Sequence, residues 1–90
     1  MTIAATILHQ LGGARFAFMT GAKTFIDSGD TLRFTLPRPR ALMSITLDAS
    51  DTYTVRRLSR TGRETDRRDG VYADQLRDVF TSMTGLYTSL

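Results

Sequence analysis

The chain has 90 residues, of which 41% are hydrophobic, and it carries a formal net charge of +3 at neutral pH. This length predicts a single domain over residues 1–90, and the hydrophobic content is too high for a disordered chain. The absence of cysteine excludes disulfide frameworks, zinc knuckles and thiol catalysis, and no apolar run approaches the roughly 18 residues that a membrane span requires.

The first predicted element is an N-terminal helix. Ile3, Ile7 and Leu11 recur at four-residue spacing, which gives the helix one apolar face. Thr2 can cap its first turn. Gly12-Gly13 predicts its end, because glycine readily adopts the left-handed conformation that a helix C-terminus requires.

Strands are predicted next. Arg15–Thr20 is the first of them, with Phe16 and Phe18 on one face, because residues two positions apart lie on the same side of a strand. Alternation of apolar and polar residues predicts four more strands. These strands cover Thr24–Asp27, Thr31–Leu36, Met43–Leu47 and a last segment that begins at Tyr53.

The end of that last strand is less regular. The alternation slips at Arg56-Arg57-Leu58, which indicates a bulge or the end of the strand. Residues 61–69 are polar and charged, so this stretch is either a loop or an exposed edge hairpin.

The strongest helical repeat lies near the C-terminus, where apolar residues follow a helical period. The repeat consists of Tyr72, Leu76, Val79, Phe80 and Met83. Asp69 or Gly70 can cap the start of this helix, and Gly85 predicts its end.

Together these elements predict an α+β fold. It has an N-terminal helix, an antiparallel sheet of four to six strands, and a C-terminal amphipathic helix that packs on one sheet face. A core this small and a strongly amphipathic terminal helix also favour a homodimer. The residues predicted at its interface are Tyr72, Leu76 and Met83.

No group of residues predicts a catalytic or metal centre, so neither an enzymatic activity nor a cofactor is expected. His9 is the single histidine, and on the predicted helix it lies opposite the apolar face, so we expect it to face solvent. One histidine without cysteine cannot supply the usual ligands of zinc. The close carboxylate pairs Asp27/Asp30 and Asp48/Asp51 fall in turns, where acids usually accept hydrogen bonds from backbone N–H groups.

The clearest charge feature is an arginine-rich stretch. Six arginines and two acids give residues 56–68 a charge of +4, whereas the rest of the chain, with six basic and seven acidic residues, carries −1. The six are Arg56, Arg57, Arg60, Arg63, Arg67 and Arg68. Guanidinium groups gathered in this way favour phosphate backbones or an anionic protein surface as partners. The alternative is a solvated charged loop that has no partner.

Three parts of the chain resemble small proteins encoded by bacteriophages, prophages and other mobile elements. These parts are Ile7–Phe16 running into Met19–Lys23, Ile45–Leu47 with Asp51–Val55, and Gly70–Leu76 with Phe80 and Thr84–Leu86. The resemblance covers nearly the whole chain and carries no catalytic residues over to it. It implies an accessory role in the cytoplasm of a bacterial host.

With the arginine stretch, the resemblance predicts a non-enzymatic accessory protein that binds nucleic acid through an arginine-rich surface. Two alternatives come from other functional classes. One is a protein-binding inhibitor of a bacterial defence system, such as an anti-CRISPR protein. The other is a structural or assembly module.

Overall fold

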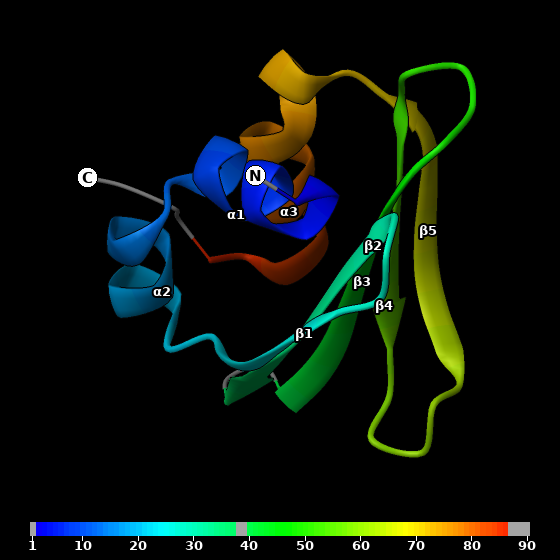
Figure 1. The fold of residues 1–90 in the computed structure, drawn as a ribbon. Coiled ribbons are helices and arrows are strands. Elements are labelled where there is room, and N and C mark those ends of the chain that lie inside the picture. The colour runs from blue at the N-terminus through cyan, green and yellow to red at the C-terminus, as the bar shows by residue number, and fades with distance from the viewer. Residues whose placement is uncertain (1, 38–39, 87–90) are drawn as a thin grey trace.

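The computed structural model describes residues 2–37 and 40–86, which form an α+β fold (Figure 1). One antiparallel sheet has the strand order β1-β2-β3-β4-β5, so each strand pairs with the next one in the chain. The helices gather on one face of the sheet, and the C-terminal helix α3 (Leu76–Thr84) contacts β4 and β5. The predicted fold class is therefore confirmed. The strands are β1 Lys23–Asp27, β2 Thr31–Pro37, β3 Arg40–Leu47, β4 Tyr53–Leu58 and β5 Glu64–Val71.

The first helix, α1 (Ile3–Leu11), begins and ends where the sequence predicts. The hydroxyl oxygen of Thr2 accepts a 3.1 Å hydrogen bond from the N–H of Ala5, which satisfies one free donor of the first turn. At the other end, the N–H groups of Gly12 and Gly13 donate to carbonyls of the last turn in the pattern of a Schellman motif. The φ angle of Gly12 is 126°, which a residue with a side chain rarely adopts.

Residues Ala14–Thr20 form a second helix, α2, so the strand predicted over Arg15–Thr20 is wrong. Phe16 and Thr20, four residues apart, are buried, whereas Phe18 is 87% exposed. The Thr20 hydroxyl donates to the Phe16 carbonyl at 2.8 Å, a bond that closes a helical turn. Two aromatic residues spaced two apart are compatible with a helix when one of them faces solvent.

The core lies between the helices and the face of the sheet that they cover. On that face Ile45 of β3 lies opposite Val55 of β4, and both side chains are fully buried. Phe16 of α2, Phe34 of β2 and Phe80 of α3 meet at the centre, with ring centroids 5.1–6.2 Å apart. Aromatic contacts in this range add to the stabilisation from burial. The aromatic cluster therefore joins two helices to the sheet.

The C-terminal helical segment differs from its prediction at the start. It opens with a 3-10 turn, η1 (Ala73–Gln75), and continues as α3 (Leu76–Thr84) to the predicted glycine stop. The predicted cap at Asp69 or Gly70 is wrong, because both residues belong to β5. Instead, the Gln75 side chain accepts a 3.2 Å hydrogen bond from the N–H of Tyr72. None of the helices in the described ranges has the length and apolarity that a membrane crossing requires.

The apolar face of α3 packs within its own chain. Leu76 and Met83, two of the three residues predicted at a dimer interface, are buried in the core. The third residue, Tyr72, is 60% exposed. The amphipathic repeat that suggested a dimer is thus explained by packing on the sheet, and of the three residues only Tyr72 is accessible to a second copy.

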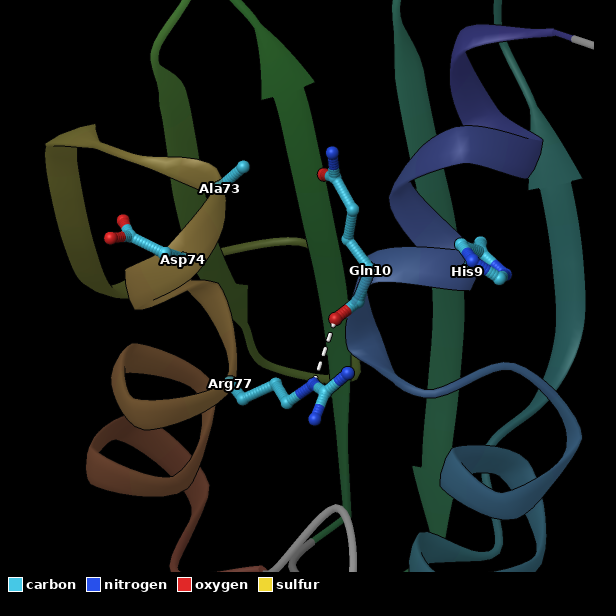
Figure 2. Close-up of a pocket in the computed structure, with 5 residues that line it drawn as sticks. All are labelled: His9, Gln10, Ala73, Asp74 and Arg77. Carbon is cyan, nitrogen blue, oxygen red and sulfur yellow. Dashed lines mark hydrogen bonds between the residues drawn. The ribbon is translucent and has the colours of Figure 1, made fainter.

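Gln10, near the end of α1, connects that helix to both β4 and α3. Its side-chain oxygen, Oε1, accepts a 2.6 Å hydrogen bond from the Tyr53 hydroxyl of β4. Its backbone carbonyl accepts a 3.0 Å hydrogen bond from Nε of Arg77 on α3 (Figure 2). Burial raises the pKa of the Tyr53 phenol, so this group stays a donor at neutral pH.

Tyr53→Phe should lower the free energy of unfolding by about 1 kcal/mol, because it removes the hydroxyl bonded to Gln10 and keeps the buried ring. Tyr72→Phe is the matched control, since that ring is exposed. Its free energy of unfolding should stay within about 0.5 kcal/mol of the wild type. Denaturant titration followed by circular dichroism measures both values. Wild-type stability in Tyr53→Phe would contradict the predicted contribution of this hydrogen bond.

Candidate nucleic-acid interface

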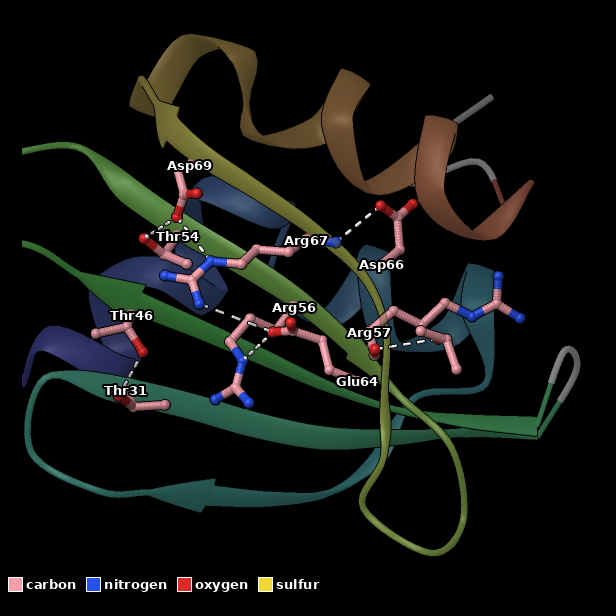
Figure 3. Close-up of polar contacts among 10 residues, drawn as sticks. Thr31, Thr46, Thr54, Arg56, Arg57, Glu64, Asp66, Arg67 and Asp69 are labelled. Carbon is pink, nitrogen blue, oxygen red and sulfur yellow. Dashed lines mark hydrogen bonds and ion pairs between the residues drawn. The ribbon is translucent and has the colours of Figure 1, made fainter.

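The face of the sheet that the helices leave open is lined with polar side chains (Figure 3). One row across it consists of Arg33, Ser44, Arg56 and Arg67, one residue from each of β2 to β5. In a neighbouring row the hydroxyls of Thr31 and Thr46 form a 2.8 Å hydrogen bond. The side chains on this face therefore carry hydroxyl and guanidinium groups, of which those of Ser44 and Thr31 are buried.

The six arginines predicted to form one surface are divided among three places. Arg56 and Arg67 lie opposite each other in β4 and β5 and share the open face. Arg57 and Arg68 lie on the helix side, because successive residues of a strand point to opposite faces. The remaining two belong to the loop between β4 and β5. The expectation of a single arginine face is therefore wrong.

The two arginines of the open face are already paired. Nε of Arg56 lies 2.7 Å from Oε1 of Glu64, and Nε of Arg67 lies 3.0 Å from Oδ1 of Asp69 (Figure 3). The hydrogen bond from Arg67 holds the pKa of the Asp69 carboxyl below its usual value, and the same contact raises the pKa of Arg67. These charges are balanced locally, so a phosphate would have to compete with a carboxylate for each of them.

The two arginines of the helix side are paired as well. Arg57 donates from Nη1 to the backbone carbonyl of Met83 at 2.8 Å, which ties β4 to the end of α3. Nη2 of Arg68 lies 3.4 Å from Oδ2 of Asp66. The other oxygen of Asp66 accepts a 2.7 Å hydrogen bond from the backbone N–H of Arg67. The bonds from Arg68 and from this N–H hold the pKa of Asp66 below its usual value.

A tight hairpin loop holds the last two arginines away from these pairs. The N–H of Ser59 donates to the Arg63 carbonyl at 2.8 Å, and the N–H of Gly62 donates to the Ser59 carbonyl at 2.9 Å. Gly62 has a φ of 88°, the left-handed value that a three-residue hairpin loop uses at its third position. Arg60 and Arg63 are both exposed.

The neighbours of this loop at the same end of the sheet are basic too. In an up-and-down sheet the starts of β1 and β3 lie at the end where β4 leads into β5. Four cations among the residues that the structure describes lie at that end, and we call them the basic end: Lys23, Arg40, Arg60 and Arg63. Within residues 2–37 and 40–86, none of the four forms an ion pair with a carboxylate.

The opposite end of the sheet is acidic. Asp27 and Asp30 flank the turn between β1 and β2, and Asp48 and Asp51 lie between β3 and β4. The sheet is therefore charged along the direction of its strands, positive at one end and negative at the other. A polyanion is attracted to the basic end and repelled by the acidic one.

Lys23 and Arg40 were not among the predicted site residues, because they lie outside the arginine-rich stretch of the sequence. The turn pattern could have identified them. Alternate turns of an up-and-down antiparallel sheet lie at the same end, so the residues just before the strands predicted over Thr24–Asp27 and Met43–Leu47 belong with the loop that follows the strand from Tyr53. The site was predicted from arginines that are close in the sequence, but the cations at this end of the sheet come from separate parts of the chain.

A pocket of about 240 Å³ opens at the basic end. Its lining residues are Thr35, Leu36, Arg40, Ala41, Leu42 and Arg60. Leu42 lies opposite Thr35 in register and shares the open face with it. Leu36 and Ala41 are buried and point to the helix side, so Leu42 is the aliphatic side chain that lies beside the two arginines of this pocket on the open face.

A second pocket, of about 380 Å³, lies between α1 and η1. Its side chains are less suited to binding a ligand or to catalysis. Nε of Arg77 in this pocket is bonded to the Gln10 carbonyl, and the exposed ring of His9 points away from Asp74 and Arg77 (Figure 2). Across the described part of the chain, no group of three or more His, Cys, Asp or Glu residues could hold a metal ion.

No protein-family model, curated protein or solved structure matches this chain. What the site binds is therefore inferred from the charge and geometry of its residues.

Proposed function

We propose that the protein is a non-enzymatic accessory protein that binds nucleic acid through the basic end of its sheet, in the cytoplasm of a bacterial host. One observation carries the proposal: Lys23, Arg40, Arg60 and Arg63 come together at one end of the sheet with no carboxylate paired to them in the described residues. Cations gathered at one end of a domain suit a phosphate backbone. The resemblance to small phage proteins fits an accessory role.

The geometry favours contact with phosphates over reading of base pairs in a groove. The four cations project from strand starts and a hairpin loop, and the helices lie on one face of the sheet (Figure 1). Within residues 2–37 and 40–86, no helix therefore extends from the basic end for insertion into a major groove. Contacts to phosphate fix position and orientation but carry no sequence information, so binding should tolerate many sequences.

Salt dependence tests this proposal. If all four cations contact phosphate, the logarithm of the binding constant should fall with the logarithm of salt concentration with a slope of roughly −3 to −4. Fluorescence anisotropy with labelled oligonucleotides of two unrelated sequences gives this slope, which should be the same for both. Absence of binding even at low salt would contradict the proposal. The basic end would then be better assigned to an acidic protein surface, as expected for an inhibitor of a bacterial defence system.

A further inference from the structure

We infer that the ligand is a single strand, and that one unpaired base enters the pocket between Arg40 and Arg60 while its neighbouring phosphates contact the basic end. This inference rests on the proposed function and names the class of nucleic acid. A pocket that combines the aliphatic side chain of Leu42 with two guanidinium groups matches the two chemical parts of a nucleotide. The base is a flat, largely apolar ring, and the phosphates beside it are anions.

The residues of the pocket divide these two roles. Leu42 supplies the apolar side-chain contact on the open face. Arg40 and Arg60 supply positive charge, and a planar guanidinium can also stack on a base. A base placed here exchanges water for aliphatic contacts and keeps its phosphates within reach of cations.

The cations continue on both sides of the pocket. Lys23 lies at the start of β1, and Arg63 lies in the loop before β5, so the basic end runs across the whole width of the sheet. Neighbouring strands are about 4.8 Å apart, so this width is roughly 19 Å. Such a span suits a short site of about four nucleotides, at the small end of the range for single-strand-binding domains.

A duplex cannot use the pocket in the same way. Its bases are paired and stacked, so entry of one base requires that the base leaves the stack, which costs free energy. A single strand has its bases free to turn toward the protein. The affinity for a single strand should therefore exceed the affinity for a duplex of equal length.

The test compares three labelled ligands of the same length on the wild-type protein. These are a thymidine oligonucleotide, the same strand built only from abasic residues, and a duplex. We expect the thymidine strand to bind about tenfold more tightly than the abasic strand, because the base leaves water against Leu42 and can stack on a guanidinium. In Leu42→Thr, which changes no charge, this ratio should fall to about 1 while the affinity for the abasic strand is kept. Thr46→Ser, on the open face away from the pocket, is the control and should keep the wild-type ratio.

Each outcome separates the inference from the function on which it rests. Equal binding of the thymidine and abasic strands by the wild type would overturn the base pocket and leave phosphate binding in place. Preference for the duplex, or a tenfold ratio retained in folded Leu42→Thr, would overturn it as well. No binding of any of the three ligands would overturn the proposed function itself. The wild-type comparison decides the question even if Leu42→Thr does not fold.

Discussion

Phe16→Ala should lower the free energy of unfolding by about 3–5 kcal/mol, whereas Phe18→Ala, two residues further, should change it by less than about 0.5 kcal/mol. Phe16 is fully buried, and its ring centroid lies 5.4 Å from that of Phe34 and 5.1 Å from that of Phe80. Truncation leaves a cavity at the meeting point of two helices and the sheet. Phe18 is 87% exposed, so its removal takes little surface out of the core.

The pair is also a direct test of α2. In a strand the two side chains would share one face and the two substitutions would have similar costs. In a helix they lie on opposite faces, as found here. Denaturant titration measures the loss in free energy of unfolding for each variant, and both variants remove the same phenyl ring. Similar losses for Phe16→Ala and Phe18→Ala would contradict the helical assignment of this segment.

The second large effect concerns nucleic acid. The triple variant with Arg40→Gln, Arg60→Gln and Arg63→Gln should flatten the salt slope of oligonucleotide binding by roughly 2–3, because each lost phosphate contact removes about 0.7–0.9. Binding at moderate salt should weaken to a similar degree for all sequences. Stability should change little, because exposed charges contribute little to it.

The matched control replaces three surface arginines that form ion pairs with carboxylates of the same chain, with Arg56→Gln, Arg67→Gln and Arg68→Gln. This control removes the same number of positive charges as the first variant, and all three of them belong to the arginine-rich stretch, residues 56–68. Because these three arginines already contact carboxylates, most of the wild-type slope should remain. Anisotropy titrations at four or more salt concentrations compare the two variants. A larger loss in the control than in the first variant would place the phosphate contacts on the strands and contradict the basic end.

Local patterns in the sequence predicted most of the fold. Thr31–Leu36 alternates apolar and polar residues, and β2 forms there with Leu32, Phe34 and Leu36 buried. The repeat that begins at Tyr72 predicted the C-terminal helix. In both cases the spacing of apolar residues within one element predicts that element, because one of its faces packs on the core. At Phe16 and Phe18 the local signal was ambiguous, since only the surrounding structure decides which ring is buried.

The candidate site was predicted less well, because it depends on relations between elements. The sequence predicted that arginines gather, but strand alternation sends Arg56 and Arg57 to opposite faces. Pairing also decides which cations are neutralised: Glu64 lies beside Arg56 only through the register of β4 and β5. Arg40 joins Arg60 through the order of strands in the sheet, which no stretch of sequence displays by itself.

The contact between the Asp66 carboxylate and the N–H of Arg67 has a consequence for self-association. β5 is the last strand of the sheet, and the bare edge of a sheet is a template on which another strand can add. Here a side chain already holds one of the amide groups of that edge. An incoming strand would have to expel a carboxylate whose pKa is held low by Arg68, so it stays charged in mildly acidic solution. We therefore expect Asp66 to hinder the addition of a further strand at this edge of the sheet.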